Sequence, residues 1–202
     1  MITERLENNQ TAHAADILKS GGLVALPTET VYGLFADALN EDAVRQVFAV
    51  KNRSLDHSLN LNISSIEDIY KYSQNQPSYL DRIVEKFMPG PLTIILEAND
   101  KVPSYINEGK KTVGFRMPAN PFTLNVIKKV GVLVGPSANI TGQSSPTKAK
   151  QVLRDFDKKI NAVKEDDSGI SGVDSTIVDF SGEKPIILRQ GAVMLESIEE
   201  LL

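Results

Sequence analysis

A short apolar run that stops at a proline is the feature that most limits how this chain can fold. Residues 22–26, Gly-Leu-Val-Ala-Leu, have the length and composition of a buried strand. Pro27 ends that strand, because proline fixes its own φ and lacks a backbone donor. Thr28, Glu29, Thr30 and Tyr32 follow at once. Open α/β sheets bind ligands at such strand ends, although the same residues also suit a solvated turn.

The rest of the chain alternates between helical and strand patterns. Apolar spacing and caps predict helices over 11–19, 40–51, 66–72, 78–87, 122–129 and 147–156, and a weak final helical turn at 197–200. Short apolar or alternating runs predict strands over 22–26, 59–63, 92–96, 112–116, 132–134, 175–180 and 186–188. Residues 181–184 predict a hairpin turn, and residues 164–172 lack periodicity and predict a mobile loop.

Helix crossovers combined with a hairpin indicate a mixed sheet. We therefore expect a single α/β domain over residues 1–202, a twisted mixed sheet with helices on its faces and a large open cavity.

Composition narrows the chemistry. The net charge is −4, so a polyanion would have to be held by a local basic cluster. The chain has no cysteine, which excludes disulfides, thiolate metal sites and thiol catalysis, and His13 and His57 are too few for a histidine metal centre. The N-terminus lacks an apolar signal segment and no run approaches membrane-spanning length, so we expect a cytoplasmic protein without membrane contact.

Further polar clusters lie at predicted helix and strand ends. Lys51 and Arg53 end a helix, where they would complement its dipole or clamp an anion. Arg116 ends a strand, as an edge charge or as a ligand contact. The hydroxyl-rich loop 135–146 is typical of solvated turns and of ligand loops alike. We expect one shared cavity, lined by Thr28, Thr30, Lys51, Arg53, Arg116, Ser137, Asn139 and Ser175.

The inventory favours phosphoryl chemistry over hydrolysis by an activated side chain. Glu29 and Asp174 are single carboxylates, each assigned a structural hydrogen-bonding role, and His57 is as well explained by a solvated loop as by ligand binding. Neither Gly-x-x-x-x-Gly-Lys nor Gly-x-Gly-x-x-Gly occurs. Hydroxyls, guanidiniums and one lysine suit an anionic substrate and charge stabilisation at phosphorus.

In order along the chain, several blocks resemble the YrdC-like family over residues 12–193. They are Pro27 to Leu34, Lys51-x-Arg53, Phe87 to Thr93, Thr112 to Pro118, Pro136 to Asn139 with Ser145 to Thr147, and Asp174 to Thr176 with Leu188-Arg189-x-Gly191. The resemblance implies an L-threonylcarbamoyladenylate synthase, a nucleotidyltransferase that uses L-threonine, bicarbonate and ATP and releases pyrophosphate. Its product would pass to a tRNA-modifying transferase complex, for N6-threonylcarbamoyladenosine at tRNA position 37.

The resemblance also implies residue roles. Lys51 and Arg53 would be catalytic. Threonine would contact Thr30, Asn62, Arg116, Ser137 and Ser175. The nucleotide would contact Lys51, Arg53, His57, Thr112, Asn139, Thr147 and Arg189. Magnesium would arrive with ATP, with no metal held by the protein.

Departures from the family pattern cluster in one segment. Asn52, Ser54, Ser58 and Asn62 replace the family's glycine, two prolines and a histidine, and Phe35, Asp174 and Gln190 are also unusual. Without the prolines, the loop 53–58 is expected to cost more entropy to order. The neutral Asn62 amide predicts a weaker or altered threonine site. The chain is also expected to lack the extra C-terminal domain of some family members.

Three other readings stay open. The first is an RNA-interacting module of the same fold, which the net charge disfavours. The second is the carbamoyl-transfer domain of hydrogenase maturation, which the absence of cysteine disfavours. The third is a family variant that acts on another amino acid.

Overall fold

Ten strands form one mixed sheet in the computed structural model, which describes residues 2–202. The sheet order is β1-β8-β2-β3-β7-β4-β6-β5-β9-β10. Its strands are β1 (Glu4–Leu6), β2 (Val24–Pro27), β3 (Tyr32–Asp37), β4 (Asn60–Asn62), β5 (Leu92–Glu97), β6 (Thr112–Arg116), β7 (Leu133–Val134), β8 (Ala162–Lys164), β9 (Thr176–Asp179) and β10 (Ile186–Arg189). The sheet contains parallel pairs such as β4 with β6 and antiparallel pairs such as β5 with β6, which confirms the predicted mixed sheet.

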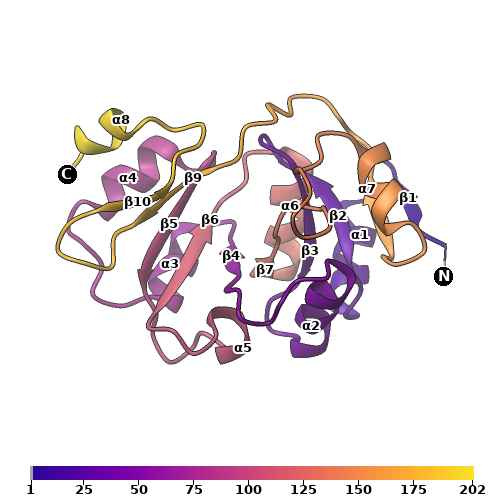
Figure 1. The fold of residues 1–202 in the computed structure, drawn as a ribbon, viewed down its shortest axis with the longest axis horizontal. Helices are drawn as coiled ribbons and strands as arrows, with labels where there is room; N and C mark the ends of the chain where they lie inside the picture. The colour runs from indigo at the N-terminus through magenta and orange to yellow at the C-terminus, as the bar shows by residue number, and fades with distance from the viewer. Residues whose placement is uncertain (1) are drawn as a thin grey trace.

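Eight helices accompany the sheet within residues 2–202. They are α1 (Thr11–Lys19), α2 (Glu41–Val50), α3 (Ile66–Tyr72), α4 (Leu80–Phe87), α5 (Ser104–Asn107), α6 (Pro121–Val130), α7 (Ala149–Phe156) and α8 (Leu195–Glu199). In Figure 1 the half of the sheet with β2 and β3 stands opposite the half with β5, β6, β9 and β10, and β7 and β4 lie between them. The two halves are therefore joined at the centre of the sheet by two short strands, β7 and β4.

Strand β2 is buried on both faces, which explains its unbroken apolar sequence. Ala25 belongs to the large core, whereas Val24 and Leu26 belong to a second core shared with α1 and α6. Successive side chains of a strand point to opposite faces, so one short run stabilises both layers.

Local capping explains where α2 and α6 begin. The Asn40 side chain accepts from the Ala43 amide at 3.1 Å, and Glu41 and Asp42 occupy the first turn of α2. Asn120 caps α6 in the same way, by accepting from the Thr123 amide at 3.2 Å. These caps agree with the start of α2 and α6 predicted from the sequence to within one residue.

Four elements were not predicted: β1, β3, β8 and α5. Strand β3 occupies much of what was predicted to be a polar loop, because Pro27 itself pairs with Tyr32 and only residues 28–31 form the turn. Strand β1 pairs with β8, about 160 residues away, so nothing local marks either strand. Elsewhere the bounds shift by a few residues; α7 begins at Ala149 and α8 at Leu195.

The segment 164–172, predicted to be mobile, is held by contacts at both of its ends. Lys164 ends β8, and further along the Ser171 amide donates to the Glu29 carbonyl at 3.0 Å. The Gly172 amide donates to the Thr30 carbonyl at 2.8 Å. The segment therefore lies along the β2–β3 turn. Among residues 2–202, no helix combines the length and apolar character needed to cross a membrane.

Candidate functional site

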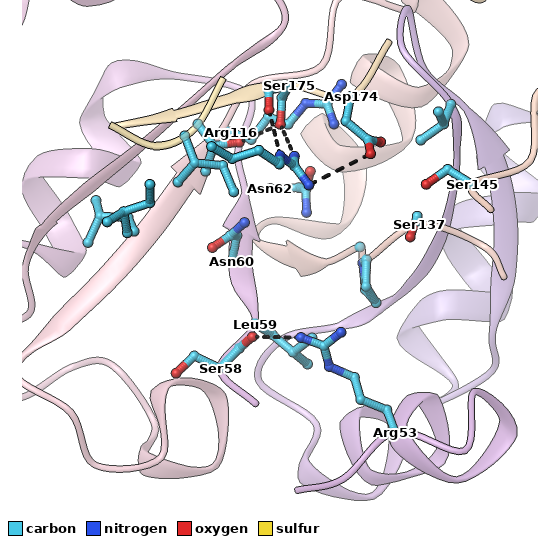
Figure 2. A pocket seen from close by; sticks show the side chains of 18 residues that line it. Arg53, Ser58, Leu59, Asn60, Asn62, Arg116, Ser137, Ser145, Asp174 and Ser175 are labelled. Carbon is cyan, nitrogen blue, oxygen red and sulfur yellow. Dashed lines mark hydrogen bonds and ion pairs between the residues drawn. The ribbon is translucent and has the colours of Figure 1, made fainter. Parts of the chain in front are cut away.

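A cavity of about 370 Å³ opens between the two halves of the sheet. Figure 2 shows Arg116, Asp174 and Ser175 on one side, Arg53 and Ser58 on the opposite side, and Asn60 and Asn62 between them. Its polar lining is Arg53, Ser58, Asn60, Asn62, Thr93, Arg116, Ser137, Ser145, Asp174, Ser175 and Arg189. Three guanidiniums and one carboxylate in this lining make the cavity suited to an anion.

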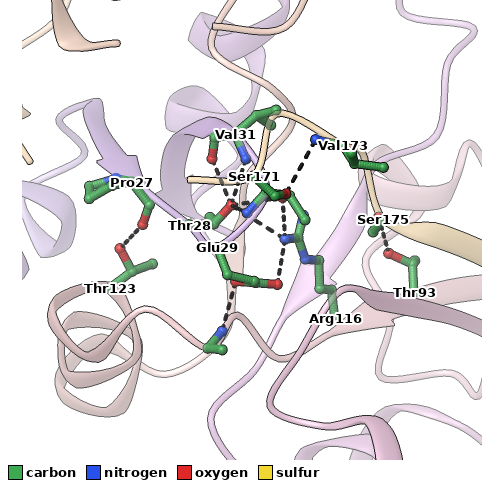
Figure 3. Close-up of polar contacts among 12 residues, drawn as sticks. Pro27, Thr28, Glu29, Val31, Thr93, Arg116, Thr123, Ser171, Val173 and Ser175 are labelled. Atoms are coloured by element: carbon green, nitrogen blue, oxygen red, sulfur yellow. Dashed lines mark hydrogen bonds and ion pairs between the residues drawn. The ribbon is translucent and has the colours of Figure 1, made fainter. Parts of the chain in front are cut away.

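Arg116, the last residue of β6, is anchored to the β2–β3 turn. Its Nη2 donates to Glu29 Oε1 at 2.9 Å and to the hydroxyls of Thr30 at 2.6 Å and Thr28 at 3.3 Å (Figure 3). The other Glu29 oxygen accepts from the Ala119 amide at 2.9 Å. Glu29 therefore has the structural role expected of it, since both of its oxygens are occupied in positioning Arg116.

Arg189, the last residue of β10, approaches the same side of the cavity. Its Nε donates to the Ser175 carbonyl at 2.9 Å and its Nη2 to the Ser175 hydroxyl at 3.0 Å, while Asp174 lies 3.9 Å from Nη1. The Ser175 hydroxyl also meets the Thr93 hydroxyl at 3.0 Å. Burial lowers the pKa of Arg189, which Asp174 partly offsets and Arg116 lowers further. Arg116 is paired with Glu29, whereas Arg189 has only Asp174 at the longer distance of 3.9 Å, so this side of the cavity keeps a partly unbalanced positive charge that favours an anionic ligand.

Arg53 reaches the opposite wall from the loop after α2. Its Nη2 donates to the Ser58 carbonyl at 3.3 Å, so the side chain spans the loop from which it projects. Burial lowers the pKa of the Arg53 guanidinium, and Glu108 and Asp56 oppose that shift. Its Nε is buried and has no hydrogen-bond partner among residues 2–202.

Lys51 lies behind the cavity wall, where it supports the loop that carries Ser137 and Asn139. Lys51 is 1% exposed, and its Nζ donates to the carbonyls of Ser137 at 2.5 Å and Asn139 at 2.6 Å. Burial, and secondarily the Arg53 charge, lower the pKa of Lys51 to about 8. In this geometry the lysine joins α2 to the hydroxyl-rich loop.

Asn139 is also turned into the loop. Its amide nitrogen donates to the carbonyls of Ile140 at 3.0 Å and Gln143 at 2.8 Å. Its Oδ1 is buried and without a partner in the described part of the chain. An unpartnered buried acceptor is costly, so this oxygen is a candidate ligand contact.

The structure brings together six of the residues to which the resemblance assigns roles. These six line the cavity: Arg53, Asn62, Arg116, Ser137, Ser175 and Arg189. Thr30, Lys51, His57, Thr112, Asn139 and Thr147 do not line it. The prediction that Thr28, Thr30, Lys51 and Asn139 form part of the lining is therefore wrong; Thr28 and Thr30 are buried beneath Arg116, and the other two are turned into the 137–143 loop.

The remaining nucleotide candidates lie in different places. His57 is exposed, 3.8 Å from Asp56. Thr112 begins β6, at the end of that strand opposite Arg116. The Thr147 amide donates to the Gln151 side chain at 2.9 Å, at the entry to α7. None of these three residues lines the cavity.

Asn60 and Thr93 line the cavity although the sequence reading did not single them out. Asn60 lies two residues before Asn62 on β4, so both amides share one face, while Leu59, Leu61 and Ile63 are buried on the other. The alternation that predicted this strand could have identified Asn60. The polar face of β4 meets the cavity rather than bulk solvent.

Phe35, one of the unusual residues, fills a space that two glycines leave. A β-carbon on Gly33 would lie 2.6 Å from the Phe35 ring, and one on Gly135 would lie 2.5 Å from it. The fully buried ring thus packs between β3 and the start of the hydroxyl-rich loop. Among residues 2–202, no group of three or more histidine, cysteine, aspartate or glutamate side chains is placed to hold a metal ion.

Comparisons with known proteins find relatives that match the whole of this chain. A threonylcarbamoyl-AMP synthase of Pyrococcus abyssi is 39% identical over 202 residues, which cover 100% of this chain and 59% of the relative. A threonylcarbamoyl-AMP synthase of Bacillus subtilis is 36% identical, with coverage of 100% and 59%. The chain thus spans about three-fifths of the length of these curated relatives.

Solved structures give the same relationship. The crystal structure of P. abyssi Sua5 complexed with L-threonine has a TM-score of 0.93 and 39% identity, and the match covers 100% of this chain and 60% of that one. Escherichia coli YciO shares the fold, with a TM-score of 0.84 at 20% identity, over 100% of this chain and 98% of YciO. The Sua5/YciO/YrdC family model, described as "Telomere recombination", matches residues 16–191. This chain belongs to the Sua5/YciO/YrdC family.

Proposed function

We propose that this chain synthesises L-threonylcarbamoyl-AMP from L-threonine, bicarbonate and ATP, with release of pyrophosphate. The observation that carries the proposal is the convergence of Arg53, Arg116 and Arg189 on one hydroxyl-lined cavity, in a chain 39% identical to a threonylcarbamoyl-AMP synthase. Guanidiniums bind carboxylates and phosphates through a planar set of donors. The cavity has such donors on both of its sides.

The two sides suit the two larger substrates. Arg116, Ser137 and Ser175 would hold threonine, with Asn62 beside them and Thr30 fixing Arg116 from behind. Arg53 would hold the phosphates, with Arg189, Asn139 and Thr147 as further nucleotide contacts. His57 would join them only if its loop closes over ATP, and Thr112, the first residue of β6, only if ATP extends to that end of the strand. Lys51 would act on the nucleotide through the Ser137–Asn139 backbone that it holds.

The chemistry requires positioning and charge neutralisation more than a proton relay. The threonine nitrogen forms a bond to the bicarbonate carbon, and water leaves to give a carbamate. A carbamate oxygen then bonds to the α-phosphorus as the bond to the pyrophosphate oxygen breaks. Arg53 would neutralise charge on the phosphates during that displacement. Magnesium would enter with ATP as part of the substrate.

We further propose that the protein works in the cytoplasm and passes its adenylate to a tRNA-modifying transferase complex. A mixed anhydride of a carbamate with a phosphate is reactive towards amines, so prompt transfer to an acceptor would limit its hydrolysis. That step would give threonylcarbamoyladenosine at tRNA position 37.

The test is to incubate the protein with Mg-ATP, bicarbonate and one amino acid at a time. We expect pyrophosphate release and an adenylate with the mass of threonylcarbamoyl-AMP with threonine, and neither product when bicarbonate is removed. A carbamoyl-adenylate of another amino acid would support the variant reading instead. Absence of any adenylate with all amino acids would refute synthase activity.

A further inference from the structure

Glu108 occupies a strained turn directly below the loop that carries Arg53. It follows α5 with φ +58°, a left-handed conformation that is uncommon for residues other than glycine. The neighbouring Asn107 side chain fixes the turn, because its amide donates to the carbonyls of Lys110 at 2.7 Å and Thr112 at 3.2 Å. The Glu108 side chain is 16% exposed, so the turn presents a nearly buried carboxylate in a fixed place.

That carboxylate is directed at Ser58. Glu108 Oε2 accepts from the Ser58 hydroxyl at 3.3 Å and from Lys110 Nζ at 2.5 Å, and Lys110 also donates to the Ser58 hydroxyl at 3.1 Å. The next residue adds a backbone contact, from the Leu59 amide to the Ile106 carbonyl at 2.8 Å. Ser58 is therefore tethered to the α5 turn, although the sequence led us to expect a loosened loop here.

Ser58 in turn holds Arg53. The only protein acceptor of the guanidinium within residues 2–202 is the Ser58 carbonyl, at 3.3 Å from Nη2 (Figure 2). Near this contact lie two buried atoms of opposite charge, Arg53 Nε and Glu108 Oε1, neither with a hydrogen-bond partner in the described chain. The Glu108 charge also raises the pKa of Arg53 against the effect of burial.

We propose that Glu108 is a positioning residue for Arg53: its carboxylate fixes Ser58, and the Ser58 carbonyl then sets the guanidinium against the cavity wall. Without this carboxylate the loop from Asn52 to Ser58 would have to be ordered by the ligand. Ordering a loop on binding weakens affinity, whereas a loop held in place beforehand does not bear that cost. The identity of the ligand as ATP rests on the proposed function, but the positioning of Arg53 does not.

The test compares Glu108→Ala and Glu108→Gln with the wild type. Glutamine keeps an oxygen that accepts from Ser58, so it serves as the conservative rescue. The matched control is Glu85→Ala, which removes an exposed glutamate of α4 that contacts neither Arg53 nor Ser58. Melting curves confirm that each variant is folded.

In the protein without ligand, Glu108→Ala is expected to increase deuterium uptake by the backbone of residues 53–59, and Glu108→Gln and Glu85→Ala to leave it near the wild-type level. The Mg-ATP dissociation constant, measured by calorimetry, should rise about five- to tenfold in Glu108→Ala, the effect of losing about one hydrogen bond. The KM for ATP should rise by the same factor while kcat changes less than twofold, because saturating ATP restores the position of Arg53.

The Arg53→Ala background tests whether Glu108 acts through Arg53. There, adding Glu108→Ala should change the Mg-ATP dissociation constant less than twofold, as expected of coupled residues. A change as large as in the wild-type background would overturn the proposal, as would unchanged deuterium uptake in Glu108→Ala or an equal effect of Glu85→Ala. If the wild type neither binds nor turns over ATP, the proposed function fails, and the uptake comparison alone decides whether Glu108 fixes the Arg53 loop.

Discussion

At the residue scale, the cavity is defined by arginines whose charges are only partly balanced. Glu29 neutralises Arg116 at 2.9 Å, and Asp174 lies at the longer distance of 3.9 Å from Arg189. Arg53 donates to a neutral carbonyl. Arg53 is therefore the guanidinium best placed to respond to a negatively charged ligand.

Replacing Arg53 by alanine is expected to reduce ATP-dependent pyrophosphate release at least about a hundredfold, because a guanidinium aimed at developing charge contributes roughly 2.7–4 kcal/mol. The melting temperature should fall by only a few degrees. Arg45→Ala, which removes an exposed arginine of α2 paired with Glu41, is the control and should keep wild-type kinetics. Unchanged turnover in Arg53→Ala would leave Arg53 with no more than a role at the helix end.

Lys51 is a buried amine whose hydrogen bonds hold the loop that carries Ser137 and Asn139. Its pKa falls from 10.5 to about 8, chiefly through burial. Below pH 8 the amine is protonated in the folded and the unfolded chain, and folding bears the cost of burying the charge. Between pH 8 and 10.5 only the unfolded chain retains the proton, so unfolding takes up a proton and stability rises with pH.

The free energy of unfolding of the wild type, minus that of Lys51→Met, should therefore increase between pH 8 and 10.5. The slope should be at most about 1.4 kcal/mol per pH unit, the value for one proton. Urea unfolding at several pH values measures it, and subtracting the variant removes the contribution of other titrating groups. A flat difference over this range would mean that Lys51 keeps an ordinary pKa in the folded protein.

At the scale of elements, the phenol of Tyr32 adds a side-chain anchor to the segment 164–172, besides the backbone bonds of Ser171 and Gly172. The Tyr32 hydroxyl donates to Asp167 at 2.8 Å and accepts from the Asp166 amide at 3.0 Å. Asp167 also accepts from the Ala149 amide at 2.8 Å, so it holds the start of α7 as well. Burial raises the pKa of Tyr32, and the phenol is thus kept as a neutral donor. The Tyr32 side chain, which comes from β3, thus links α7 to the segment 164–172 along the β2–β3 turn.

Tyr32→Phe is expected to destabilise the protein by about 1–3 kcal/mol, because Asp167 loses a donor and the Asp166 amide an acceptor. Deuterium uptake should increase at residues 166–172 and at the first turn of α7. Tyr70→Phe is the matched control, since its hydroxyl contacts Asp81 on the exposed surface. Equal stability of the two variants would show that backbone hydrogen bonds alone hold the segment 164–172.

At the scale of the whole molecule, charge is separated between the cavity and the rest of the protein. The cavity gathers three arginines in a chain whose net charge is −4. Proteins that bind nucleic acid without sequence preference rely on many cations facing the phosphates. This balance favours a small polyanion over RNA as the ligand of the cavity.

We therefore expect double-stranded RNA and unmodified tRNA to bind with a dissociation constant weaker than about 100 µM at 0.15 M salt. Fluorescence anisotropy with labelled RNA measures this, with Mg-ATP binding as the positive control for folded protein. Micromolar binding that weakens steeply with added salt would favour the RNA-interacting module.

How much could be read from the sequence depends on how local the signal was. The strands at 24–27, 92–97 and 112–116 and the capped helices α2 and α6 have their determinants within a few residues, in apolar runs, prolines and capping asparagines. Six of the residues around the cavity were instead assigned through the resemblance of the polar blocks to the family. Short-range sterics and hydrogen bonds act whatever the rest of the chain does.

The tertiary structure alone decided which of these side chains face the cavity. Strand β8 forms between β1 and β2, which are far from it in the sequence. Thr30 and Lys51 are buried because Arg116 and the carbonyls of Ser137 and Asn139 meet them there. Glu108 lies 55 positions after Arg53 in the sequence, yet its carboxylate accepts from Ser58, at the end of the loop that carries Arg53. Such contacts form between segments that only folding brings together, so no local pattern of residues encodes them.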